Sequence, residues 1–140
     1  MTGKGRVVAR AAWLVGLVGC WPWALMAFGH TTVEAVRDPS CLPWMWKCLA
    51  FAVPSGVLPG LAAGWMLAGP ATAVRPVVRK WWAALAVWET YVAVNVVLGV
   101  VTDGGVFGVL AVIGAPVIAV IAAYASPWIA SAAAPRKVRT

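Results

Sequence analysis

Long apolar runs separated by short polar connections make up most of this chain. Four runs, at residues 11–29, 48–69, 81–101 and 106–130, consist almost entirely of apolar and small residues. A helix needs about 20 residues to cross the hydrocarbon core of a bilayer, and each run reaches about that length. The pattern therefore predicts four transmembrane helices.

The runs do not alternate between polar and apolar positions, as the strands of a membrane β-barrel do. Because backbone groups in lipid must be hydrogen-bonded within the chain, the runs are expected to be α-helical. The composition agrees: of 140 residues, 63% are hydrophobic and 11% are charged, against about 25% charged in soluble domains. We predict an all-α integral membrane protein in which residues 1–140 form one domain, a compact four-helix bundle with short loops.

The basic residues lie mostly on one side of the predicted bundle. Nine of the eleven Lys and Arg residues fall in segment 1–10, in the connection between the second and third helices, and in the tail 131–140. Because positively charged segments stay in the cytoplasm, both termini are predicted to be cytoplasmic and the protein to lie in the cell membrane. The net charge of +7 thus indicates topology. No nucleic-acid partner is expected, since that would need a basic face on a folded soluble module.

Seven of the ten tryptophans lie near the predicted membrane boundaries. Such belts are typical of membrane interfaces, and we prefer this interpretation to a ligand-binding aromatic box. The residues near the inner helix ends are Trp13, Trp65, Trp81, Trp82 and Trp128, and those near the outer start of the second helix are Trp44 and Trp46.

The connection between the first two helices carries several reactive or polar side chains. Cys41 and Cys48 fall on the predicted outer side, where oxidising conditions would allow a disulfide, and two free thiols are the alternative. Thr31 and Glu34 have the spacing of a capping box, which predicts a short interfacial helix there. His30 is the single histidine and the chain has no Cys-x-x-Cys pair, so neither a metal site nor a cofactor is expected.

Small residues recur every fourth position along the second helix. This row lets another helix approach closely, because packing drives the association of helices in lipid. The sequence does not decide whether the row packs inside the bundle or against another chain. The residues of the row are Ala52, Gly56, Gly60, Gly64 and Ala68.

Prolines fall inside three of the four runs: Pro22 in the first, Pro54 and Pro59 in the second, and Pro116 in the fourth. Each removes a backbone hydrogen bond and can kink its helix. Broken helices that bind substrate are known from transporters. We prefer the simpler interpretation that membrane helices tolerate proline.

Glu89 is an acidic residue within a predicted span, with Thr90 and Asn95 as further polar candidates on the same helix. Eight residues separate it from Trp81, which places it about 12 Å into the membrane. Leu85, Glu89 and Ala93 share one face, and Asn95 lies well around the helix from them. An acid at this depth marks a functional candidate. It could cycle a proton, stay protonated and hydrogen-bonded, or pair with a basic residue of another subunit.

The pattern of residues argues against an enzyme, because it offers no nucleophile with a base, no paired membrane carboxylates and no phosphate-binding glycine loop. The leading hypothesis is a small membrane subunit or accessory component that associates with itself or other membrane subunits through helix packing. The alternative is a small proton- or cation-coupled transporter or oligomeric pore that uses Glu89. A phage-type holin, a small helical protein with basic ends that perforates membranes, is a third hypothesis.

Overall fold

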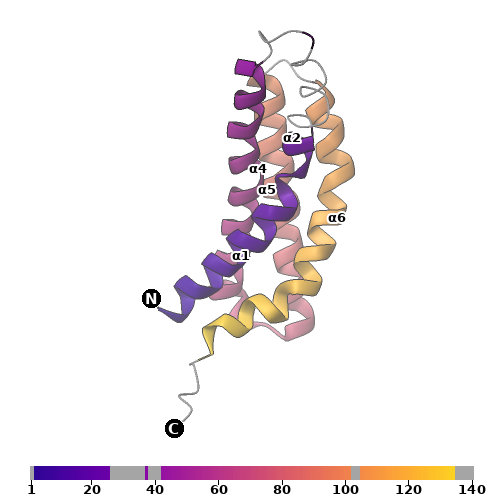
Figure 1. The fold of residues 1–140 in the computed structure, drawn as a ribbon. Helices are drawn as coiled ribbons and strands as arrows, with labels where there is room; N and C mark the ends of the chain where they lie inside the picture. The colour runs from indigo at the N-terminus through magenta and orange to yellow at the C-terminus, as the bar shows by residue number, and fades with distance from the viewer. Residues whose placement is uncertain (1, 26–36, 38–41, 102–104, 135–140) are drawn as a thin grey trace.

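The computed structural model describes residues 2–25, 37, 42–101 and 105–134. Within these residues the protein is all-helical, with five α-helices and no strand (Figure 1). The elements are α1 (Gly3–Gly19), α2 (Trp21–Leu25), α4 (Leu42–Ala68), the 3-10 turn η3 (Pro70–Ala73), α5 (Pro76–Val101), α6 (Gly105–Ala130) and the 3-10 turn η4 (Ser131–Ala133).

Three segments of the described chain are long and apolar enough to cross a membrane. They are Leu49–Ala73, Pro76–Val101 and Ala111–Ala133, and they correspond to the second, third and fourth predicted spans. All three helices that carry them begin before the predicted boundary, so α5 takes in the basic residues Arg79 and Lys80. The three segments indicate an integral membrane protein.

The first predicted span differs from its expected form. The predicted basic tail 1–10 is helical from Gly3 onward, and α1 ends at Gly19 instead of continuing. The reason is Pro22, which has no N–H to bond the carbonyl of Val18. The chain turns at Cys20 and starts α2 at Trp21, which places Pro22 in the first turn of the new helix, where no N–H is needed.

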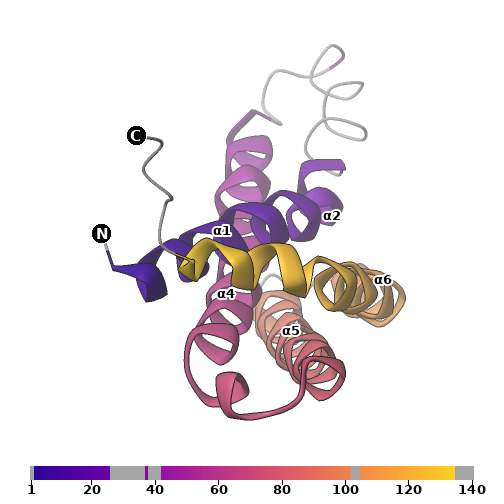
Figure 2. The ribbon, with the colours of Figure 1, turned by 90° about the horizontal axis from the view of Figure 1, so that it is seen from below.

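The helices pack side by side in a bundle, with α1 crossing obliquely against α4 and α5 lying between α4 and α6 (Figure 2). The start of α1, the turn between α4 and α5, and the end of α6 lie at one end of the bundle (Figure 1). Small side chains fill the interior, and several are fully buried. These are Ala11, Ala63, Ala83, Ala115 and Ala122.

The outer surface of the bundle is apolar on every helix. Large aliphatic side chains project outward on α1, α4, α5 and α6, where a water-soluble protein would place charged groups. All five tryptophans predicted near the inner helix ends have exposed side chains. Examples of exposed side chains are Trp13, Leu17, Val53, Leu61, Trp65, Trp81, Trp82, Val97, Val112, Ile113 and Trp128.

The row of small residues on α4 lies against α1. A Cβ added to Gly60 would lie 2.7 Å from the Ala12 Cα, and one added to Gly64 would lie 2.7 Å from the Val8 Cα. A Cβ on Gly56 would meet the carbonyl oxygen of Gly16. At the ends of the row, Ala52 packs beside Trp23 and Ala68 beside the buried cluster of α1. The close approach permitted by these residues is therefore used within the chain.

Two arginines of α1 hold the carboxyl end of α6. The Arg10 Nη1 donates to the Trp128 carbonyl at 2.8 Å and to the Ser131 hydroxyl at 3.2 Å, while its guanidinium lies 4.5 Å from the Trp128 ring centroid. The Arg6 Nε donates to the Ala132 carbonyl at 3.0 Å. The last carbonyls of a helix have no partner within it, and a cation there also interacts favourably with the negative end of the helix dipole.

Candidate functional site

The structure separates the three polar residues predicted as intramembrane candidates. Asn95 is buried in the bundle, Thr90 is half-buried, and Glu89 is exposed on the outer surface of α5. Six helical residues separate Glu89 from Asn95, which turns the two side chains about 120° apart at 3.6 residues per turn. Two distinct sites therefore have to be considered.

The first site is a buried hydrogen-bonded cluster around Asn95. Its Oδ1 accepts from the Trp23 Nε1 at 3.1 Å and lies 3.2 Å from the Ser55 hydroxyl. That hydroxyl has one proton, and the Gly19 carbonyl at 3.4 Å is its other acceptor. The Asn95 Nδ2 donates to the Tyr91 carbonyl at 2.9 Å. One amide thus joins α2, α4 and α5.

Tyr91 lies one turn before Asn95 and is fully buried. Within the described residues, its hydroxyl is the one buried side-chain oxygen or nitrogen without a hydrogen-bond partner. Gly114 provides the room for it, because a Cβ there would lie 3.3 Å from the hydroxyl oxygen. The groups of the cluster are amides, hydroxyls and an indole. They fix the positions of helices and include no carboxylate or imidazole that would act as a base near neutral pH.

Sequence reasoning missed Trp23, Ser55 and Tyr91 as members of this cluster. The four-residue spacing of Tyr91 and Asn95 was a usable signal, since such residues share one helix face. Ser55 lies between Pro54 and the glycine row, where the sequence pattern indicates helix packing and gives no sign of a hydrogen-bonding role for Ser55. Trp23 was not foreseen because its burial depends on the break at Cys20, after which α2 changes direction.

The second site is the outer surface of α5 around Glu89. Glu89 lies at the middle of this 26-residue helix. Residues on the same outward stripe are apolar, and no described residue forms a hydrogen bond or ion pair with the Glu89 carboxyl group. Lys80, the nearest cation along α5, is nine residues away, or about 13 Å at 1.5 Å per residue. The stripe consists of Val78, Trp82, Leu85, Glu89, Ala93, Val96 and Val100.

The remaining candidates lie partly outside the described residues. Cys41, His30 and the predicted interfacial helix at Thr31–Glu34 are not described, nor is the side chain of Cys48. Cys20 is a free thiol, and it donates to the Leu17 carbonyl at 3.2 Å. Among the described residues, no group of three or more His, Cys, Asp or Glu side chains could hold a metal ion.

Comparison with protein-family models, curated proteins and solved structures finds no match to this chain.

Proposed function

We propose that this protein is a non-enzymatic four-span subunit of a membrane complex, and that it associates with its partner through the outer stripe of α5. The observation that carries the proposal is the position of Glu89, in the middle of a membrane span and pointing away from its own bundle. A charged residue at the centre of a lone helix costs about 2.5–3.5 kcal/mol to insert. A partner that offers a hydrogen-bond donor or a cation to Glu89 would remove much of this cost.

The packing of the glycine row also supports the outer stripe of α5 as the association surface, because it excludes the row itself. Gly56, Gly60 and Gly64 contact α1 backbone within the chain and are covered. They therefore offer no surface to another subunit, and the association surface has to lie elsewhere. The stripe around Glu89 is an exposed helix face that combines apolar area with a polar group, and packing and interhelical hydrogen bonds both contribute to the association of membrane helices.

The four-span, N-in and C-in topology is part of the proposal. In the described chain, the basic residues of α1 and those around η3 lie at the end of the bundle that also holds the end of α6. Chain ends on one side of the membrane require an even number of crossings. The segment from α1 through α2 then has to supply the first crossing, and the positive end lies in the cytoplasm.

The test is the composition of the complex extracted gently from native membranes. We expect the wild-type chain to co-purify with stoichiometric membrane partners, and Glu89→Leu to lose at least nine tenths of them. Glu89→Gln, which keeps a hydrogen-bonding group of the same size, separates a hydrogen bond (partner retained) from an ion pair (partner lost). Val112→Leu on the outer face of α6 is the control. An unchanged mass and composition for Glu89→Leu would contradict the proposal.

A coupled transporter or oligomeric pore is the second candidate, because a carboxyl group at mid-membrane can exchange a proton. Glu89 faces outward, so such a pathway would run between subunits. It predicts a homo-oligomer in which Glu89→Gln abolishes proton-coupled flux in proteoliposomes while the fold is retained. Wild-type flux in that variant would exclude it. The holin alternative rests on size and basic ends alone, and cell lysis on induced expression would test it.

A further inference from the structure

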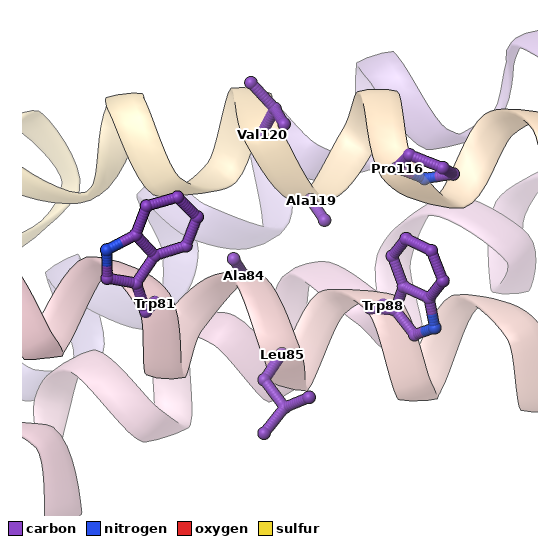
Figure 3. A pocket seen from close by; sticks show the side chains of 7 residues that line it. All are labelled: Trp81, Ala84, Leu85, Trp88, Pro116, Ala119 and Val120. Atoms are coloured by element: carbon purple, nitrogen blue, oxygen red, sulfur yellow. The ribbon is translucent and has the colours of Figure 1, made fainter.

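A narrow apolar groove runs between α5 and α6 on the outside of the bundle, beside the stripe of Glu89. Its volume is about 290 Å³. The floor is formed by Ala84 and Ala119, which face each other across the gap, and the rings of Trp81 and Trp88 stand at its two ends (Figure 3). Ala84 and Ala119 belong to a cluster of small buried side chains between the two helices, and larger side chains at these positions would fill the groove.

The groove covers about two thirds of the hydrocarbon depth of one leaflet. Trp81 and Trp88 are seven residues apart, or about 10 Å along the helix. Trp88 lies next to the midpoint of α5, and Trp81 lies at the interfacial end of that helix. Since the hydrocarbon core is about 30 Å thick, the groove covers most of one half of it. A lipid acyl chain has this depth and orientation.

A cation lies at the interfacial end of the groove. The Lys80 Nζ is 5.4 Å from the ring centroid of Trp81 on α5 and 5.8 Å from that of Tyr124 on α6, so it bridges the two helices that form the walls. Glu89 is the one acidic residue in the described part of the chain, and it is too far along α5 to pair with Lys80. Unlike Arg6, Arg10 and Arg79, which donate to backbone carbonyls, Lys80 has no hydrogen bond to a described residue.

We propose that this groove binds one anionic phospholipid of the inner leaflet, with an acyl chain between Trp81 and Trp88 and the headgroup phosphate at Lys80. Basic positions between transmembrane helices at the cytoplasmic side attract anionic headgroups. The groove supplies the second part of the site, because its lining is apolar throughout. Charge at the interfacial end and an apolar slot within one leaflet fit an anionic phospholipid better than a helix of a second copy. The Glu89 of a second copy lies at mid-span, about 13 Å from the level of Lys80. The proposal does not depend on the function of Glu89, but the choice of the inner leaflet rests on the orientation proposed above.

The experiment counts lipids on the full-length protein by native mass spectrometry after reconstitution with phosphatidylglycerol and phosphatidylcholine at equal amounts. We expect one phosphatidylglycerol to stay bound to each chain at a collisional activation energy that removes phosphatidylcholine. Lys80→Gln should weaken this retention about five-fold, since a basic residue near a membrane surface contributes about that factor. Arg75→Gln, an exposed basic residue on the same side, is the control for charge and should retain the lipid.

A second pair of variants tests the groove itself. Val120→Trp places a large side chain in the groove from an exposed position on its wall and should remove lipid retention, whereas Val112→Trp, exposed on α6 outside the groove, should not. Equal retention of the two phospholipids by the wild type would overturn the proposal. So would full retention by Lys80→Gln or by Val120→Trp. A lipid-free dimer that Val120→Trp converts to monomer would instead assign the groove to a second copy.

Discussion

At the scale of single residues, two polar residues of α5, Asn95 and Glu89, have opposite environments. Asn95 is 2% exposed and uses both ends of its amide, accepting from Trp23 and donating to the Tyr91 carbonyl. A buried amide without these partners would cost free energy, because nothing in the membrane interior replaces them. Glu89 has no such arrangement within the described chain. This difference is why we assign Asn95 to folding and Glu89 to association.

The first prediction follows from the Asn95 cluster. Asn95→Leu removes the hydrogen bond between the Trp23 indole and the Asn95 amide, so we expect the free energy of unfolding to fall by about 1–3 kcal/mol. Trp23→Phe removes the donor and keeps most of the ring. In the double variant, the coupling between the two positions should be about 0.6–1.7 kcal/mol, the range for interhelical hydrogen bonds in membranes. The measurement is titration of the detergent-solubilised protein with SDS, followed by circular dichroism. Purely additive effects would show that the bond contributes nothing.

The sequence predicts the part of these sites that follows from the geometry of a single helix. The outward stripe of Leu85, Glu89 and Ala93 follows from the helical repeat alone, and all three side chains are exposed. The repeat also places Asn95 on another face. It cannot say which face meets α4, because that depends on how α1 and α6 pack. Ser55 and Trp23 come from other elements, so their meeting with Asn95 needed three-dimensional information.

At the scale of elements, the contact between α1 and α4 is determined by glycine on α4 and small residues on α1. The sequence shows the row at residues 52–68. It also shows a shorter row of small residues in the first run, at Ala12, Gly16, Cys20 and Ala24, but it does not show that the two rows meet. In the structure they meet along α1 from Val8 to Gly19, opposite Gly64, Gly60 and Gly56. The helices begin earlier than predicted. Interfacial residues such as Arg79 are polar and end the apolar run, yet they continue the helix.

The second prediction compares two glycine-to-alanine changes at this contact. Gly60→Ala places a methyl group 2.7 Å from the Ala12 Cα. Because relieving this overlap requires the α1 backbone to shift, we expect the free energy of unfolding to fall by about 1–3 kcal/mol. Gly16→Ala meets the Val57 Cγ2 at 3.8 Å, an ordinary contact. Because alanine favours a helix interior over glycine by about 0.5–1 kcal/mol, this variant should be neutral or stabilised. The same SDS titration measures both, and equal destabilisation would refute the packing account.

The third prediction concerns the contact between α1 and the end of α6. Arg10→Gln removes the ring contact with Trp128 and weakens the hydrogen bonding of the Trp128 carbonyl. We therefore expect the free energy of unfolding to fall by about 1 kcal/mol. Arg10→Lys keeps the charge but not the planar fork, and should recover only part of it. Lys4→Gln is the matched control for loss of charge on exposed α1. If Lys4→Gln destabilises the protein as much as Arg10→Gln, general electrostatics and not this contact is responsible.

At the scale of the whole molecule, orientation in the membrane connects both proposals. The end of the bundle that holds η3 and the end of α6 also holds Lys80 and the opening of the α5–α6 groove, so one topology decides which leaflet supplies the lipid. Fixed charges at this end favour the cytoplasm. The anionic surface of the cytoplasmic leaflet then lies next to Lys80.

The fourth prediction tests this orientation with single cysteines in a chain whose native Cys20, Cys41 and Cys48 are replaced by Ser. Thr72→Cys in η3 and Ala134→Cys after η4 are exposed at the basic end, and Trp46→Cys is exposed near the start of α4. In intact cells, a membrane-impermeant maleimide should label only Trp46→Cys, and the other two should react after the cells are opened. Labelling of all three in detergent shows that each thiol is reactive. If Thr72→Cys and Ala134→Cys fall on opposite sides, α5 and α6 do not both cross the membrane. If both are labelled from outside, the bundle is inverted, and the groove then opens to the outer leaflet, where Lys80 would meet fewer anionic headgroups.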